Sequence, residues 1–227
     1  MTRAPWMIYL ARLAVTVSLP VLLIASPLYY FISPAYVASQ YARPGFPPSS
    51  RFTPDERQRL SDVLVNYLRG RASLDDMVSL RTDSGQIALR SQEVEHMVDV
   101  KGVTDAFFIA HPVALVLLLL GGWFTWRVGR DEVARALRQG VWLTGGLMLL
   151  VLLTSLVDFS TFFTKFHELF FAPGTWTFFE QDTLIQLYPL VFWSDTTLLL
   201  GGVILAEAVL VYALTGFLTR ERQRPGR

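Results

Sequence analysis

Four long apolar runs dominate the pattern of hydrophobic and polar positions along the chain. They cover residues 13–32, 107–126, 141–163 and 197–218. Each is close to the ~20 residues that an α-helix needs to cross the hydrocarbon core of a bilayer. The first run is long for the apolar part of a signal peptide, and no small-residue cleavage site follows, so we expect it to be retained. The pattern predicts an all-α membrane protein with a bundle of four transmembrane helices.

The segment between the first two runs, residues 34–105, has the pattern of a mainly helical domain outside the membrane. Thr53 is placed as an N-cap, Pro54 as the first helical residue and Glu56 as the third position of a capping box. Apolar residues then recur with the spacing of one helix face, which predicts an amphipathic helix. Two short apolar stretches around Asp-Ser-Gly indicate a small hairpin near 78–89.

The short segments rich in arginine predict the orientation of the chain. Such segments stay in the cytoplasm, whereas a segment as long as 34–105 crosses the membrane whatever its charge. We therefore expect both termini to be cytoplasmic. The predicted order is a cytoplasmic N-terminus with the first helix (1–33), an extracytoplasmic domain (34–105), the second helix (106–126), a cytoplasmic loop (127–140), the third helix (141–163), an extracytoplasmic loop (164–195), the fourth helix (196–218) and a cytoplasmic tail (219–227).

Composition supports the membrane class and narrows the chemistry. Of the 227 residues, 52% are hydrophobic and 17% are charged, which is fewer charges than soluble domains carry. The net charge of +1 indicates no nucleic-acid partner. The absence of cysteine excludes disulfides, thiolate nucleophiles and cysteine-ligated metals.

Two polar clusters, each with a histidine, border apolar runs on the predicted outer side. The first is residues 93–101 with His96, and the second is residues 165–168 with His167. In a helix, Asp99 lies one turn from both Glu95 and His96. A carboxylate beside an imidazole raises its pKa or orients its ring, and both effects serve acid–base catalysis. The alternative interpretation is that these residues are charged caps at helix ends.

Other polar and aromatic positions have less specific interpretations. The loop after His167 is rich in aromatic residues, which suits membrane anchoring or a groove for acyl chains, with Trp176 and Tyr188 as donors. Two histidines with Glu95 or Asp99 also form a candidate zinc set, but the spacing matches no compact zinc motif, so we expect no metal and no cofactor. Glu207, within the fourth run, is expected to be structural and bonded to a Ser or Thr.

Three short motifs together resemble the bacterial lipoprotein intramolecular transacylase family. They are EHMVDVK at 95–101, FHELFF at 166–171, followed by Trp176, and DTLIQLYPLVF at 182–192. The resemblance extends to the four spans and two outer loops. It implies an enzyme that moves the sn-2 acyl chain of a diacylglyceryl-cysteine lipoprotein to the α-amino group of the same cysteine. The product is an N-acyl lyso-form lipoprotein.

The resemblance also implies partners and residue roles. The partners are the diacylglyceryl lipoprotein and membrane lipids, and the enzyme is expected to act as a monomer in the bacterial cytoplasmic membrane. Aminolysis of an ester needs a base, an acid and a donor to the oxyanion. We predict His96 and His167 as the acid–base pair. The remaining predictions are Asp99 or Glu95 to orient an imidazole, and Lys101, Trp176, Tyr188 and Phe170 to bind substrate.

Two other classes of function remain open on the residues alone. One is another histidine- or zinc-dependent hydrolase or acyltransferase acting on membrane lipids. The other is a non-catalytic membrane scaffold. The two histidines distinguish these classes, because a scaffold tolerates their replacement and an acid–base pair does not.

Overall fold

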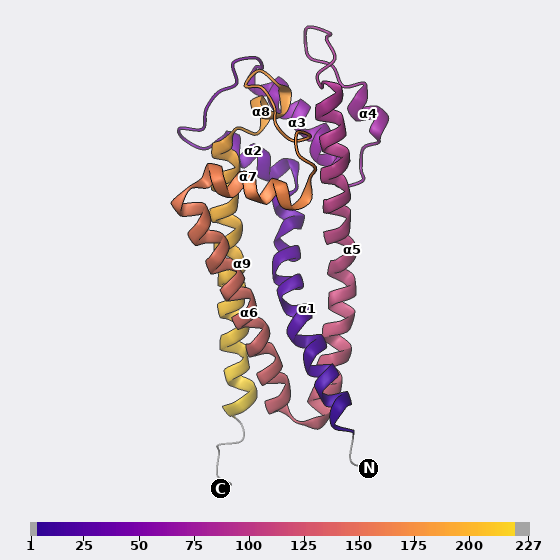
Figure 1. The fold of residues 1–227 in the computed structure, drawn as a ribbon, viewed down its shortest axis with the longest axis vertical. Coiled ribbons are helices and arrows are strands. Elements are labelled where there is room, and N and C mark those ends of the chain that lie inside the picture. Colours follow the sequence, from indigo (N-terminus) through magenta and orange to yellow (C-terminus); the bar gives the residue numbers. More distant parts are fainter. Residues whose placement is uncertain (1–3, 221–227) are drawn as a thin grey trace. The chain divides into compact units, whose positions relative to one another are not determined.

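The computed structural model describes residues 4–220, and within them every regular element is a helix (Figure 1). The helices are α1 (Pro5–Phe31), α2 (Pro34–Tyr41), α3 (Pro54–Leu68), α4 (Leu74–Val78), α5 (Ser91–Val128), α6 (Arg130–Val157), α7 (Phe159–Phe170), α8 (Thr183–Leu187) and α9 (Leu190–Arg220). Four of them, α1, α5, α6 and α9, are long and apolar enough to cross a membrane. The predicted all-α fold with four spans is confirmed.

The described chain divides into two compact units. The bundle unit comprises residues 4–27, 107–153 and 200–220, and the polar unit comprises residues 28–106 and 154–199. The bundle unit contains most of the apolar runs, and the polar unit contains both predicted histidine clusters. The predicted candidate site therefore lies within a single unit.

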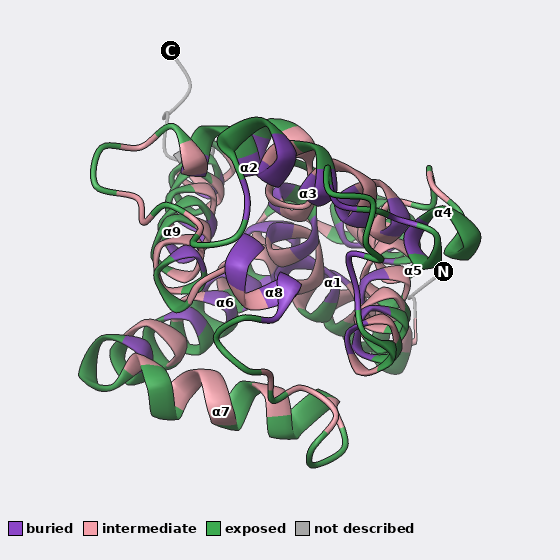
Figure 2. Cartoon of the chain, turned by 90° about the horizontal axis from the view of Figure 1, so that it is seen from above, coloured by how far each residue is buried: buried purple, intermediate pink, exposed green. Residues whose placement is uncertain are grey.

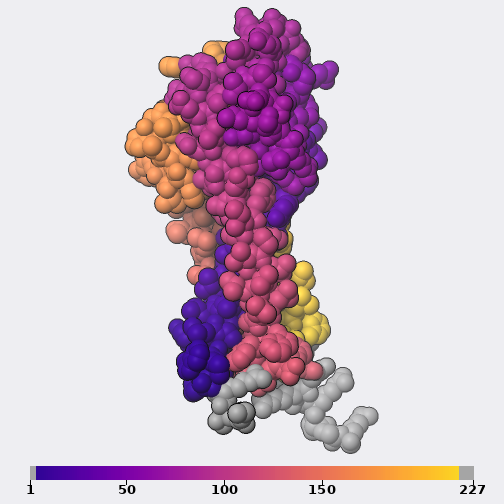
Figure 3. Space-filling view, turned by 90° about the vertical axis from the view of Figure 1, so that its right-hand side faces the viewer, coloured from indigo at the N-terminus to yellow at the C-terminus, as the bar shows by residue number. Residues whose placement is uncertain are grey.

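In the bundle unit, the core lies between the long helices and the outside is apolar. Leu19, Leu23, Met148 and Ile204 are buried in this core. A Cβ added at Gly121 of α5 would lie 2.8 Å from the Ala11 carbonyl oxygen of α1, so glycine allows these helices to approach closely. Figure 3 shows the α5 stretch of this unit beside the N-terminal part of α1. The apolar exterior suits contact with lipid.

Glu207 lies on α9 within the bundle unit. One of its carboxylate oxygens, Oε2, is buried without a hydrogen-bond partner among the described residues. The predicted bond to a Ser or Thr is therefore wrong for this oxygen.

The third apolar run does not form one helix. α6 ends at Val157, six residues before the predicted end, and α7 begins at Phe159. Asp158 separates them because its carboxylate accepts hydrogen bonds from Thr161 N at 3.1 Å and Thr161 Oγ1 at 2.6 Å, which is an N-cap. The aromatic residues after it belong to a short amphipathic helix instead of a span.

The predicted loop at residues 127–140 is almost entirely helical. Only Gly129 separates α5 from α6, and the arginines of this segment lie on helices. Asp131 and Glu132 lie in the first turn of α6, where negative charge favours helix formation. A polar, arginine-rich segment between two apolar runs resembles a loop in sequence, although such residues are well tolerated at helix ends.

The polar unit has its own hydrophobic core. Phe52, Leu60, Leu64, Met77 and Leu187 are buried in it, together with parts of α3, α5 and α8. Figure 2 shows that α8 is largely buried, whereas α7 is exposed or half-buried along its length. Two consecutive helices of this unit therefore differ in packing: α7 is weakly covered, and α8 is tightly packed.

Two local predictions for this unit are confirmed only in part. Thr53 caps α3 and accepts a hydrogen bond from Glu56 N at 3.2 Å. The Glu56 side chain, however, accepts from Asp83 N at 2.7 Å, so it holds the neighbouring turn and not the cap. The expected hairpin is a single antiparallel bridge between Arg81 and Ile87.

Candidate active site

The start of α5 divides the first polar cluster between a buried face and an exposed face. Glu93, His96 and Met97 are buried, with His96 only 7% exposed, because positions i, i+3 and i+4 share one face of a helix. Glu95 and Asp99 lie on the exposed face. The helix is continuous from Ser91 through the second span.

Glu93 joins the start of α5 to α8. Its carboxylate accepts hydrogen bonds from Arg90 N at 2.9 Å and from Leu184 N at 2.7 Å. Burial raises the pKa of Glu93, and these two hydrogen bonds oppose the rise. Glu93 therefore holds together two segments that are distant in sequence, a role that the sequence analysis missed.

Asp182 and Arg90 tie the end of the loop between α7 and α8 to the residue that precedes α5. The Asp182 carboxylate accepts from Phe179 N at 2.7 Å and from the Arg90 guanidinium at 2.5 Å. Asp182 is buried, so these bonds matter more than those of an exposed ion pair. The loop that carries Trp176 is thereby anchored at its far end.

His167 lies on α7, and its backbone contact defines its tautomer. Nδ1 of His167 is 2.8 Å from the carbonyl oxygen of Phe163. A carbonyl oxygen only accepts, so Nδ1 is the donor in this bond and carries a proton. In the neutral imidazole, Nε2 then has a free lone pair and can act as a base.

The two predicted histidines lie against each other. Their ring centroids are 6.0 Å apart, and the ring planes are inclined by 25°. Phe171 and Phe178 contact His96 at centroid distances of 5.0 and 5.4 Å, and Trp176 contacts His167 at 4.9 Å. The structure thus brings His96, His167 and Trp176 together in an aromatic setting.

This setting keeps both imidazoles neutral near neutral pH. Burial, and to a smaller degree the charge of His167, lowers the pKa of His96 to about 4. Burial also lowers the pKa of His167, while the hydrogen bond to Phe163 opposes that change. A neutral imidazole can accept a proton from a reacting group, which a protonated one cannot.

Two buried donor or acceptor atoms at the site have no partner among the described residues. They are Nδ1 of His96 and Nε1 of Trp176. A buried polar atom without a hydrogen bond costs about 1–3 kcal/mol, so each such atom calls for an explanation. Their position beside the histidine pair suits contact with a ligand.

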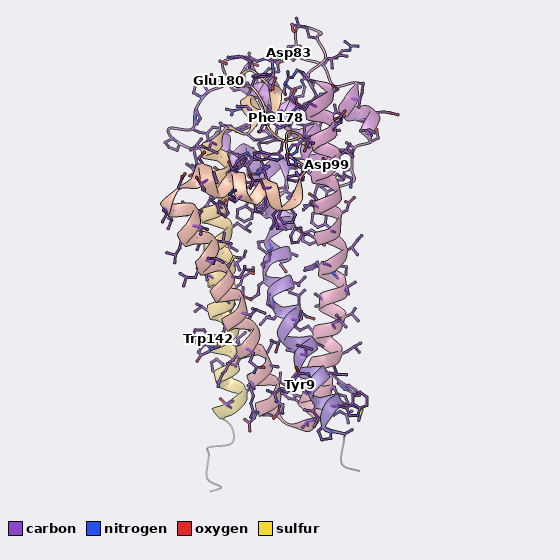
Figure 4. All side chains as sticks on the ribbon, in the orientation of Figure 1. Tyr9, Asp83, Asp99, Trp142, Phe178 and Glu180 are labelled. Carbon is purple, nitrogen blue, oxygen red and sulfur yellow. The ribbon has the colours of Figure 1, made fainter. Side chains whose placement is uncertain are left out.

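The other predicted site residues lie elsewhere. No hydrogen bond joins Glu95 or Asp99 to either imidazole within residues 4–220, so their predicted orienting role has no contact behind it. Figure 4 labels Asp99 on α5 and Phe178 in the loop after α7. Lys101 pairs with Asp105 at 2.6 Å, and its ammonium lies 6.0 Å from the Tyr67 ring.

Tyr188 and Phe170, both predicted to bind substrate, have different surroundings. The Tyr188 hydroxyl is hydrogen-bonded to Ser61 Oγ at 2.8 Å, and the ring packs against the core of the polar unit. Phe170 is 39% exposed and packs on Phe166 within α7. Neither residue has a ring contact with a histidine in the described part of the chain. Residues 4–220 also hold no group of three or more side chains placed to bind a metal.

Four apolar spans and a neutral imidazole pair define an integral membrane protein with a site suited to acid–base chemistry. The lipoprotein intramolecular transacylase family, Lit, matches residues 8–193. The chain belongs to this family of membrane enzymes, as the resemblance predicted.

Three relatives place the chain more closely. It is 28% identical over 193 residues to an uncharacterized protein of Aquifex aeolicus (strain VF5), covering 83% of this chain and 85% of that protein. The solved structure of the membrane-integral lipoprotein intramolecular transacylase Lit from Bacillus cereus has a TM-score of 0.69 at 19% identity, covering 96% of both chains. A variant of that protein with a histidine replaced by alanine gives a TM-score of 0.66 at 21% identity, again with 96% of both chains covered. The fold is therefore the same.

Proposed function

We propose that this transacylase moves the sn-2 acyl chain of a diacylglyceryl lipoprotein to the α-amino group of the lipoprotein's own cysteine. The proposal rests on family membership and, above all, on the His96–His167 contact at 6.0 Å. Both reacting groups belong to one substrate molecule, so positioning supplies much of the rate. No acyl donor besides the lipoprotein is required.

The proposed orientation puts the histidine pair on the extracytoplasmic face of the cytoplasmic membrane. The arginine-rich ends of the bundle helices favour a cytoplasmic location for both termini. Lipidated cysteines lie at the outer surface in this arrangement, so the polar unit meets its substrate there. Diacylglyceryl lipoprotein and surrounding lipids are the partners.

His167 is proposed as the base. The substrate amine attacks the ester carbonyl carbon while Nε2 of His167 removes the amine proton, since Nδ1 is occupied by the Phe163 carbonyl. The tetrahedral intermediate collapses as the bond from carbon to the glycerol oxygen breaks. The same proton is returned to that oxygen, directly or by way of His96, and both imidazoles end neutral.

Trp176 is proposed to donate to the oxyanion of the tetrahedral intermediate. Its Nε1–H is buried, has no partner among the described residues and lies on the ring that contacts His167. A donor placed in advance at a developing oxyanion is a strong source of rate enhancement. Lys101, the alternative donor, is paired with Asp105.

The direct test is to produce the protein in a bacterial strain whose lipoproteins remain diacylated. Mass spectrometry of a lipoprotein N-terminus should show one fatty acid on the cysteine nitrogen and one fewer on the glycerol. An unchanged diacylglyceryl form, with the protein present in the membrane, contradicts the proposal. A lyso-form lacking the N-acyl group would identify a hydrolase instead.

A further inference from the structure

A hollow of about 360 Å³ lies in the bundle unit, and none of the residues that line it is used in the acyl-transfer proposal. It is lined by α6 and the last turn of α9. The lining side chains are Asp131, Ala134, Arg135, Arg138, Gln139, Trp142 and Thr219. Positive, polar and aromatic groups thus share one concave surface in a unit that is otherwise mostly apolar.

Arg138 is held in place without a carboxylate. Its Nε donates to Thr215 Oγ1 at 2.9 Å, and its guanidinium lies 5.6 Å from the Tyr212 ring. No ion pair with an acidic side chain involves Arg138 in the described part of the chain. The terminal nitrogens of this half-buried guanidinium remain as donors to a ligand.

Arg135 adds to the positive charge of the hollow. It approaches Glu132 at 3.5 Å, but Glu132 also faces Arg12 at 3.4 Å, so one carboxylate serves two cations. Asp131 is the acidic residue of the lining, and two arginines against one aspartate give the lining a formal charge of +1.

The aromatic part of the hollow suits a ligand with an apolar tail. Trp142, labelled in Figure 4, is 71% exposed, and its ring lies 6.1 Å from Tyr212 of α9. Tryptophan prefers the level of lipid headgroups, where its ring meets both hydrocarbon and polar groups. A free anion would make no contact with these aromatic rings, whereas the apolar part of a lipid would cover them.

We infer that this hollow binds the phosphate headgroup of an anionic phospholipid. Arg135 and Arg138 donate to the phosphate, and Trp142 packs along the lipid. Arginine matches phosphate geometry through paired N–H donors, and basic pockets between membrane helices recognise anionic headgroups. Because the arginine-rich ends of these helices favour the cytoplasmic side, the bound lipid belongs to the cytoplasmic leaflet in the proposed orientation.

Lipid binding to the purified full-length protein tests the inference. Native mass spectrometry would give the affinity for phosphatidylglycerol, with phosphatidylcholine and inorganic phosphate as comparison ligands. Arg135→Gln and Arg138→Gln should each weaken phosphatidylglycerol binding about tenfold, as expected for the loss of a charge-assisted contact. Arg135 is exposed, so its variant keeps the test valid even if Arg138→Gln folds poorly.

Arg127→Gln is the matched control. The substitution removes one positive charge, as the two test variants do. Arg127 itself stacks on Trp123 at 5.0 Å and does not line the hollow. Equal weakening in this control would show diffuse attraction by surface charge and overturn the inference. Equal binding of phosphatidylcholine, or full competition by inorganic phosphate, would do the same.

Discussion

The two histidine-bearing segments of the polar unit are held in place by different means. His96 lies on a helix face buried in a hydrophobic core and joined to α8 through Glu93. His167 lies on α7, which has no buried residue in its twelve positions. One imidazole is therefore positioned by packing, and the other by an N-cap, one backbone contact and its aromatic neighbours. The comparison teaches that the surroundings of His96, such as Glu93, should matter for the stability of the fold, whereas those of His167 should matter mainly for the reaction.

Replacing either histidine should have the largest effect on activity. His96→Ala and His167→Ala should each reduce acyl transfer by about 10²–10⁴-fold, because each removes a proposed proton-transfer group. His111→Ala is the control, since His111 is bonded to Ser26 in the bundle unit. Quantitative mass spectrometry of lipoprotein N-termini measures the ratio of products. Near-normal transfer by either variant would separate that histidine from catalysis.

Glu93→Ala should have the largest effect on stability. It leaves the Leu184 and Arg90 amides without an acceptor in a buried region, at a cost of about 1–3 kcal/mol. Glu95→Ala removes an exposed carboxylate two positions away and should leave the unfolding midpoint unchanged. Thermal unfolding in detergent compares the two. A Glu93→Ala protein as stable as the control would contradict the role of Glu93 between α5 and α8.

Trp176→Phe should slow the reaction without weakening substrate binding. The ring is kept while the Nε1 donor is lost, so kcat should fall about 10–100-fold with KM nearly constant. Trp126→Phe makes the same change on α5 in the bundle unit. A rise in KM with constant kcat would instead assign Trp176 to substrate binding.

The pH dependence should report the lowered pKa of the buried pair. At pH 5.5, an ordinary histidine is neutral in roughly a tenth of molecules. His96, with its pKa lowered to about 4, stays neutral there, so its ring should take up a proton only well below pH 6. Titration of the His96 ring followed by NMR, with the His96→Phe protein to assign the signal, provides the measurement, and a midpoint at 6.5 or above would contradict the buried setting.

The same shift sets the sign of a stability change with pH. The unfolded chain binds a proton at this histidine near pH 6.5, whereas the folded chain does not until about pH 4. The contribution of the neutral His96 ring to the free energy of unfolding is therefore complete above pH 6.5 and is lost as the pH falls toward 4. His96→Phe should flatten the dependence in that window.

The smallest effect is expected on the exposed face of α5. Asp99→Asn and Glu95→Gln should change transfer by less than about twofold, because surface substitutions away from bonded groups have small effects. A large loss of activity would restore the imidazole-orienting role that the sequence predicted for these carboxylates.

The spans and the histidine pair were predictable from the sequence because each has a strong local signal. An apolar run of about 20 residues has few structural solutions other than a membrane helix. The two clusters were recognised by their histidines, and the structure brings these rings within 6.0 Å. The predicted end of the third span was wrong because residues 159–163 continue the apolar pattern of the run, and the helix break is visible only once Asp158 is recognised as a cap.

The role of Glu93 was harder to predict. The stretch 93–101 presents several carboxylates that look alike in sequence, and only the fold decides which one is buried. Its partner Leu184 is distant in the chain and lies on a five-residue helix without a strong pattern of its own. Helical spacing from His96 therefore favoured Glu95 and Asp99, although both face away from the core.

The stacked imidazoles limit how much charge the site can hold. Each ring is partly desolvated, and a charge on His167 further disfavours protonation of His96. Two positive rings 6.0 Å apart in such surroundings would repel each other strongly. The pair consequently has a capacity of one proton. Aminolysis of an ester by a neutral amine moves one proton from nitrogen to oxygen, so the stoichiometry of the proposed transfer step matches the capacity of the pair.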